Sequence, residues 1–226
     1  LASHRCARDD YSEGILLDAN ENSYGPTVEG STVELSVEDL QLNRYPDPAQ
    51  ASNQYRSSSQ LEVKKLLCGL KDNGITPANI FVGVGSDEAI DILMRIFCAP
   101  GKDSILVTPP TYGMYKVCAK VNDVAVQMVP LTPEFDVVVS DVLRAVKPST
   151  KLLFLCSPGN PTGVVVPLQV VRDIHAAYDG IIVVDEAYID FASQPSACDL
   201  VAEGLDRVVV LQTLSKAWGM AAIRMG

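Results

Sequence analysis

The chain has 226 residues, of which 47% are hydrophobic, so it is long enough to bury a substantial core in one large domain or in one domain and part of another. Its formal net charge of −10 and its pI near 4.6 argue against a surface that binds nucleic acid or an anionic membrane. No apolar run approaches the roughly 20 residues of a membrane-spanning helix.

Six cysteines are scattered along the chain, without a C-x-x-C pair and with only two histidines. This pattern disfavours a zinc or other metal site and is typical of a reducing compartment, so we expect a cytoplasmic location. Cys98, Cys118 and Cys156 lie in apolar surroundings and are expected to be small core residues.

The N-terminal part of the chain shows little hydrophobic periodicity. Residues 22–26 carry turn signals, and residues 37–42 favour a short helix. Residues 43–48, "NRYPDP", are expected to be extended because each proline disfavours helix in the residue before it. The polar stretch 49–60 is typical of a loop, and residues 61–70 predict a short amphipathic helix ended by a glycine.

From residue 79 onward, short apolar and β-branched runs alternate with helical segments. Strands are predicted at residues 79–85, 104–110, 124–131, 151–156, 180–188 and 207–213. Helices are predicted at residues 86–98, 112–121, 141–145 and 167–178, the first with Ser86 as its N-cap. This alternation predicts an α/β fold with a mostly parallel sheet flanked by helices on both faces.

In such a sheet, ligands bind outside the carboxyl ends of the strands. The residues predicted to stand there are Ser86, Asp87, Tyr112, Asn160, Asp185, Tyr188, Thr213, Ser215 and Lys216. Arg224 follows Lys216 after eight positions. We therefore expect one binding site at this edge of the sheet.

Two of these residues suggest the chemistry of a cofactor ring. A lysine amine such as that of Lys216 forms an imine with an aldehyde. An aspartate at a buried strand end, here Asp185, keeps a pyridine nitrogen protonated and so turns the ring into an electron sink.

The remaining groups suit the other parts of the same cofactor. A Gly-Ser-Asp turn that opens a helix offers backbone N–H groups to a phosphate, to which Thr213, Ser215 and Arg224 add hydroxyl and guanidinium donors. Tyr112 is suited to stack on a flat ring, and Asn160 with Tyr188 to donate to a phenolate oxygen. An aldehyde, a basic ring nitrogen, a phenolate and a phosphate together describe pyridoxal 5′-phosphate.

Five ordered motifs resemble those of the fold-type I pyridoxal-phosphate aminotransferases, namely "GSDEAI", "PPTYGMY", "SPGNPTG", "VVDEAYIDF" and "TLSKAWGMAAIRMG". Two more, "LLDANENSYGP" and "NRYPDP", make the chain similar to the histidinol-phosphate aminotransferases, from about residue 16 to residue 226. The resemblance implies an enzyme of histidine biosynthesis. It would transfer an amino group between histidinol phosphate (imidazole acetol phosphate as the keto form) and the pair 2-oxoglutarate and glutamate.

The resemblance also implies a role for each residue. Lys216 would form the internal aldimine and move the proton in catalysis, and Asp185 would pair with the pyridine nitrogen. Tyr112 would stack on the ring, Asn160 and Tyr188 would contact the ring oxygen, and Ser86, Asp87, Thr213, Ser215 and Arg224 would surround the phosphate. Tyr45 would reach the phosphate of the neighbouring subunit's cofactor, which implies a homodimer with shared sites. Tyr24 and Asn160 would lie near the substrate.

The same resemblance implies a domain layout. Residues 1–48 would be an N-terminal arm that contributes to the dimer and the site, and residues 49–226 an incomplete, C-terminally truncated large domain. Family members continue into a small C-terminal domain, which carries the arginine that grips the substrate carboxylate. The stretch 49–60 is also longer than the family's usual connection.

Three alternatives remain open. The chain could be an aromatic or aspartate aminotransferase of the same fold, a threonine-phosphate decarboxylase, or an inactive truncated fragment. A dinucleotide-binding loop at "GVGSDE" is disfavoured, because Glu88 stands where the third glycine belongs.

Overall fold

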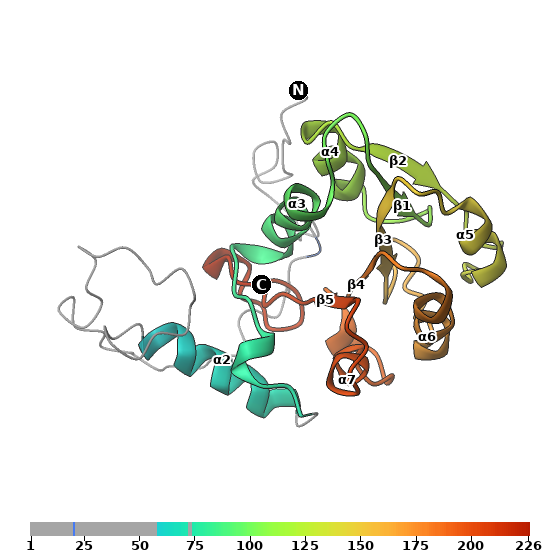
Figure 1. Ribbon diagram of the computed structural model, residues 1–226. Helices are drawn as coiled ribbons and strands as arrows, with labels where there is room; N and C mark the ends of the chain where they lie inside the picture. The colour runs from blue at the N-terminus through green and yellow to red at the C-terminus, as the bar shows by residue number, and fades with distance from the viewer. Residues whose placement is uncertain (1–19, 21–57, 72–73) are drawn as a thin grey trace, which may run out of the picture. The chain divides into compact units, whose positions relative to one another are not determined.

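The computed structural model describes residue 20, residues 58–71 and residues 74–226 (Figure 1). Contacts divide the chain into two compact units, Leu1–Pro26 with Gly83–Gly226, and Thr27–Val82. The predicted boundary between residues 48 and 49 falls inside the second unit, and the predicted domain layout stays a prediction.

The described part of the second unit contains the helix α2 (Ser58–Lys71) and the 3-10 turn η2 (Pro77–Asn79). α2 includes the predicted helix 61–70 and begins earlier, so residues 58–60 are helical and not loop. The predicted strand at 79–85 is wrong. The Asn79 carboxamide holds a tight turn by accepting from the Thr76 N–H at 3.0 Å. Gly83 then makes only one reciprocal backbone pair, with Gly226, which is too short for a strand.

The first unit contains a five-stranded sheet of order β2-β1-β3-β4-β5 in which every neighbouring pair is parallel. Its strands are β1 (Ser104–Val107), β2 (Ala125–Met128), β3 (Thr150–Cys156), β4 (Ile181–Asp185) and β5 (Val208–Leu211). This confirms the predicted parallel α/β sheet. Several strands are shorter than predicted, and β4 ends at Asp185, so the three residues after it are not in the strand.

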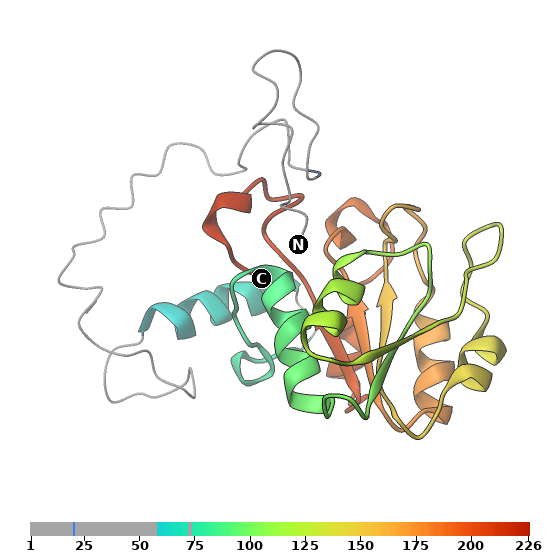
Figure 2. The same ribbon diagram turned by 90° about the horizontal axis from the view of Figure 1, so that it is seen from above.

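Helices cover both faces of this sheet (Figures 1 and 2). They are α3 (Gly85–Phe97), α4 (Met114–Val121), α5 (Val139–Ala145), α6 (Leu168–Ala177) and the unpredicted α7 (Cys198–Ala202). α3 and α4 pack on one face and α5, α6 and α7 on the other. Successive residues of a strand point to opposite faces of the sheet and so enter different cores. Leu153 packs with α6, whereas Phe154 packs with α3 and α4.

The N-terminus of α3 differs from its prediction. The helix begins at Gly85 and its N-cap is Val84, so the prediction that Ser86 caps it is wrong. The Glu88 carboxylate instead accepts from the Val84 N–H at 2.6 Å, which satisfies a backbone donor that the helix leaves unpaired.

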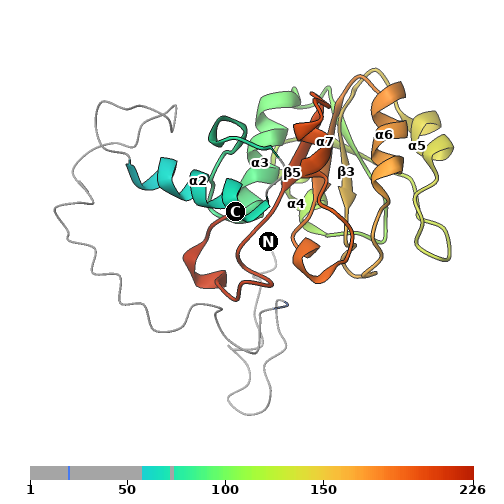
Figure 3. The ribbon, with the colours of Figure 1, turned by 90° about the horizontal axis from the view of Figure 1, so that it is seen from below.

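The chain after β5 returns to the start of α3 (Figure 3). It passes through the short turn η4 (Ala221–Ile223), and the Gly83 N–H then donates to the Gly226 carbonyl at 2.8 Å. A Cβ at residue 226 would lie 2.8 Å from the Ser86 nitrogen, so this close approach requires glycine. Within the described ranges, no helix has the length and hydropathy needed to cross a bilayer.

Candidate active site

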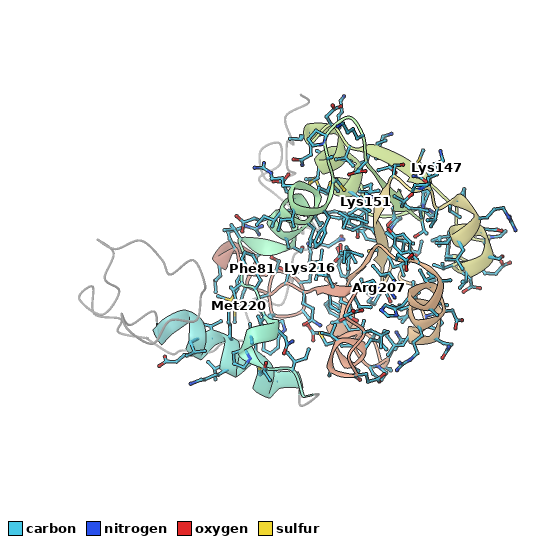
Figure 4. The ribbon with its side chains drawn as sticks, in the orientation of Figure 1. Phe81, Lys147, Lys151, Arg207, Lys216 and Met220 are labelled. Carbon is cyan, nitrogen blue, oxygen red and sulfur yellow. The ribbon has the colours of Figure 1, made fainter. Side chains whose placement is uncertain are left out.

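The carboxyl ends of the strands meet at one edge of the sheet, beside the N-terminus of α3. The strand order reverses direction here, because the chain passes from β1 to β2 on one side and then to β3 on the other. Lys216 lies beyond the end of β5 in this region, whereas Lys151 lies in β3 and Lys147 just before it (Figure 4). Tyr24 and Tyr45 lie outside the described residues.

Among the predicted site residues that the structure describes, Asp185 is the most buried, with 2% of its surface exposed. Its Oδ2 accepts from the Tyr115 hydroxyl at 2.6 Å, and its Oδ1 accepts from the Ala187 N–H at 3.2 Å. Burial raises the pKa of Asp185 above its ordinary value, while these two hydrogen bonds and the charge of Lys216 act in the opposite direction. A buried carboxylate is stabilised by a cation placed beside it.

Tyr188 lies between two amides and the lysine. Its hydroxyl oxygen accepts from Asn20 Nδ2 at 2.8 Å and lies 3.5 Å from Asn160 Nδ2. Lys216 Nζ lies 5.8 Å from the centroid of the Tyr188 ring. Because both amides approach as donors, the Tyr188 O–H remains available to donate to a ligand. Burial raises the pKa of Tyr188, so the hydroxyl stays protonated at neutral pH.

Tyr112 belongs to the segment between β1 and α4. Its hydroxyl donates to Asp87 Oδ1 at 3.0 Å, which joins this segment to the first turn of α3. Burial, followed by the charge of Asp87, raises the pKa of Tyr112 well above its ordinary value. The ring is therefore a neutral face at the edge of the site.

Hydroxyl and guanidinium donors gather at the start of α3. Thr213 and Ser215 are both buried, and their hydroxyl oxygens lie 2.9 Å apart. Arg224 adopts a left-handed backbone conformation with φ 55, and one guanidinium nitrogen lies 2.6 Å from where a Cβ on Gly85 would stand. The guanidinium thus lies against the positive end of a helix that is 13 residues long, an arrangement that attracts an anion.

These residues fit pyridoxal 5′-phosphate in three respects. Asp185 is a buried carboxylate that a protonated ring nitrogen would stabilise. The donors around the start of α3 suit a phosphate, and a Cβ at residue 85 would fill the space that the Arg224 guanidinium borders. Lys216 and the Tyr188 hydroxyl approach from the ends of neighbouring strands, β5 and β4, where an aldehyde and a phenolate need an amine and a donor.

Sequence reasoning missed Tyr115 and Asn20. The pattern of α4 marks Tyr115 only as an apolar-face residue, and no local signal shows that its hydroxyl meets a carboxylate 70 positions later. Asn20 contacts Tyr188 across 168 positions. The only signal for that segment was the resemblance of its motif "LLDANENSYGP" to the histidinol-phosphate aminotransferases.

Comparison with known proteins places the chain in a family. The family model of aminotransferase class I and II matches residues 12–226, so the chain belongs to this family. The match supports pyridoxal 5′-phosphate as its cofactor.

Two curated relatives of the chain are both histidinol-phosphate aminotransferases. The chain is 50% identical over 97% of its length to histidinol-phosphate aminotransferase of Cytophaga hutchinsonii, and 48% identical over 100% to that of Schizosaccharomyces pombe. It spans 57% of the length of each. A solved structure of a putative histidinol-phosphate aminotransferase from Erwinia carotovora shares the fold, with a TM-score of 0.72 and 22% identity over 92% of this chain and 58% of that one.

A Gly85→Ala substitution is expected to weaken pyridoxal-phosphate binding by about tenfold or more, because the added methyl would displace the Arg224 guanidinium from the start of α3. The positive φ of 78 at this position adds a stability cost of about 1–3 kcal/mol. Cofactor affinity is measured by fluorescence titration. Gly204→Ala is the control, because it has a φ of 97 with no atom within 4 Å of the added methyl. Equal affinities in the two variants would contradict the role of Arg224.

Proposed function

We propose that this chain is the cofactor-binding part of a histidinol-phosphate transaminase. The observation that carries the proposal is the placement of the buried Asp185 at the end of β4 and of Lys216 just beyond β5, both at the carboxyl edge of an aminotransferase sheet. The substrate class comes from the names of relatives that match the chain along almost all of its length.

When bound, pyridoxal phosphate supplies an aldehyde that condenses with amines and a protonated ring that accepts electrons. Asp185 would hold the proton on the ring nitrogen, since its carboxylate is buried and already oriented by Tyr115. Tyr188 would donate its O–H to the ring oxygen. Lys216 Nζ would take up the proton that leaves the substrate's Cα and return it later. Thr213, Ser215, Arg224 and the first turn of α3, with Ser86 and Asp87, would hold the phosphate.

A pocket beside the cofactor edge gives space for the substrate. It has a volume of about 340 Å³ and is lined by residues of the "SPGNPTG" loop together with Asn20, Tyr188 and Phe191. Its two amides and one hydroxyl, Asn20, Asn160 and Tyr188, supply polar contacts in a mostly apolar lining. We propose that part of the substrate binds here, with Tyr24 nearby.

The assembly and location are also proposals. The resemblance supports a homodimer in which Tyr45 of each subunit reaches the other's phosphate site, with residues 1–48 as an arm and 49–226 as the large domain. Among the described cysteines, Cys68, Cys98, Cys118 and Cys156 are thiols outside any disulfide, which supports a reducing compartment such as the cytoplasm.

The test is a substrate panel with 2-oxoglutarate as amino acceptor. The complete natural protein, whose extent is checked by intact mass, is expected to form glutamate from histidinol phosphate at least about 100-fold faster than from aspartate, because a site built for a polar group rejects substrates that lack it. Faster turnover of aspartate would favour an aspartate aminotransferase. Release of carbon dioxide from threonine phosphate would favour the decarboxylase.

The same assay is run on residues 1–226 alone. Turnover by the natural protein without turnover by this segment would show that residues outside it complete the site. No turnover and no pyridoxal-phosphate absorbance in either would overturn the proposed function.

A further inference from the structure

Tyr115 contacts the carboxylate at the centre of the proposed site from inside the core. It lies on α4, with 1% of its surface exposed, and its hydroxyl donates to Asp185 Oδ2 at 2.6 Å. Its ring stacks on Phe154 of β3, with centroids 4.7 Å apart and an angle of 25° between the planes. It also meets Tyr112 edge-on at 5.7 Å. Packing on these two sides fixes the ring and therefore the direction of the hydroxyl.

The hydroxyl acts on Asp185 as a permanent donor. Burial, followed by the charge of Asp185, raises the pKa of Tyr115 well above its ordinary value, so the phenol stays protonated. Cys156 lies opposite Asp185 in the β3–β4 register, and burial raises the pKa of its thiol to about 12. Both neighbours are thus neutral at physiological pH, and neither places a second negative charge beside Asp185.

The donor also opposes the effect of burial. Removal from water favours the protonated form of Asp185, whereas the hydrogen bond from Tyr115 favours the charged form. Other groups near the carboxylate are the Ala187 N–H, Asp87 of α3, Lys216 after β5 and the Tyr188 phenol. The Tyr115 hydroxyl donates to the carboxylate at 2.6 Å, a shorter hydrogen bond than the one of 3.2 Å from the Ala187 N–H.

We propose that Tyr115 is a positioning residue, which orients the Asp185 carboxylate and keeps it ionised so that the proton of the proposed site rests on the cofactor's ring nitrogen and not on Asp185. The inference rests on the proposed function for the identity of the partner. The coupling between Tyr115 and Asp185 itself belongs to the protein without cofactor.

The test compares Tyr115→Phe with Tyr178→Phe in the complete natural protein. Both substitutions delete one buried hydroxyl and keep the ring. Tyr178 is 4% exposed, and its hydroxyl donates to the Thr150 carbonyl at 3.1 Å, in the core on the other face of the sheet. An effect of Tyr115→Phe that exceeds this control therefore reflects the particular contacts of the Tyr115 hydroxyl, foremost the hydrogen bond of 2.6 Å to Asp185.

The first measurement needs no cofactor. In the folded protein the pKa of Asp185 lies above its unfolded value. Ionisation of this carboxyl therefore lowers the free energy of unfolding as pH rises from the unfolded pKa toward the folded pKa. Removing the Tyr115 donor raises the folded pKa further. The denaturation midpoint of Tyr115→Phe is therefore expected to fall further below wild type as pH rises above the unfolded carboxyl pKa of about 4. The offset of Tyr178→Phe is expected to stay constant over this range.

The second measurement uses nitrogen-15-labelled pyridoxal phosphate. The ring-nitrogen NMR signal in Tyr115→Phe is expected to move toward the unprotonated position, because a more basic carboxylate competes for the shared proton. In Tyr178→Phe it should match wild type. Alongside it, kcat should fall about tenfold to a hundredfold in Tyr115→Phe with KM changed less than about twofold.

The outcomes separate the two proposals. A finding that the wild-type protein binds no cofactor would contradict the proposed function. The denaturation midpoints measured against pH would still test the coupling of Tyr115 to Asp185. Normal wild-type behaviour, with Tyr115→Phe matching Tyr178→Phe in both the pH series and the nitrogen signal, would overturn the role of Tyr115.

Discussion

A Lys216→Arg enzyme is expected to lose transaminase activity by about 10⁴-fold or more while it still folds and retains pyridoxal phosphate through the donors around the start of α3. Arginine keeps the positive charge beside the Tyr188 ring, where Lys216 Nζ lies 5.8 Å from the centroid. Its guanidinium does not deprotonate at physiological pH, so it serves neither as the amine that condenses with an aldehyde nor as the base for the substrate proton. Single-turnover kinetics with histidinol phosphate measure the loss.

Chemical labelling provides a second measurement. Borohydride treatment of the wild-type holoenzyme, followed by peptide mapping, is expected to place the reduced cofactor on Lys216. Lys151→Arg is the matched control, because Lys151 is near the amino end of β3 and its Nζ donates to the Pro148 carbonyl at 3.1 Å (Figure 4). Label on Lys151, or near-normal turnover by Lys216→Arg, would refute the assignment.

Asp185→Asn is the second large effect that we expect. The amide is nearly the same size as the carboxylate and still accepts from the Tyr115 hydroxyl, so the fold and cofactor binding should be largely kept. It carries no charge to hold a proton on the ring nitrogen, and kcat should fall by about 10²–10³-fold. Turnover is measured together with the nitrogen-15 signal of labelled cofactor, which should shift to the unprotonated position.

The neighbouring Glu186 offers a control for loss of a buried carboxylate. It is also 2% exposed, but it accepts from the Ala197 N–H at 2.6 Å and from Gln212 Nε2 at 2.8 Å, and so anchors the segment that leads into α7. Glu186→Gln is expected to lower the free energy of unfolding and to leave the ring-nitrogen signal unchanged. An Asp185→Asn enzyme with near-normal turnover would rule out the proposed pairing.

The proposed site could be predicted from sequence where its residues follow directly on apolar strands. Asn160, Asp185 and Lys216 come just after the runs that form β3, β4 and β5, or end them. Because the carboxyl ends of parallel strands lie at one edge of a sheet, recognising the strands and their direction was enough to bring these residues together. The sheet itself was predictable because strands buried on both faces are almost continuously apolar.

Strand prediction from local sequence pattern is wrong where strand formation depends on the pairing partner of the segment. Residues 79–85 have the composition of a strand, yet Gly83 pairs with Gly226 alone, and the helix after it begins at Gly85 and not after Ser86. Strand formation depends on a neighbour with a continuous ladder, and a sequence window contains no information about that neighbour.

The parallel α/β fold and the set of groups suited to the cofactor could thus be predicted from the sequence, because apolar periodicity and motif order are local properties. The hydrogen bond from the Tyr115 hydroxyl to Asp185 across 70 positions, and that from Asn20 to Tyr188 across 168, became visible only in the tertiary structure. Contacts between side chains of distant segments depend on how α4 packs on β3 and β4, and that packing is set by the shape of the whole core.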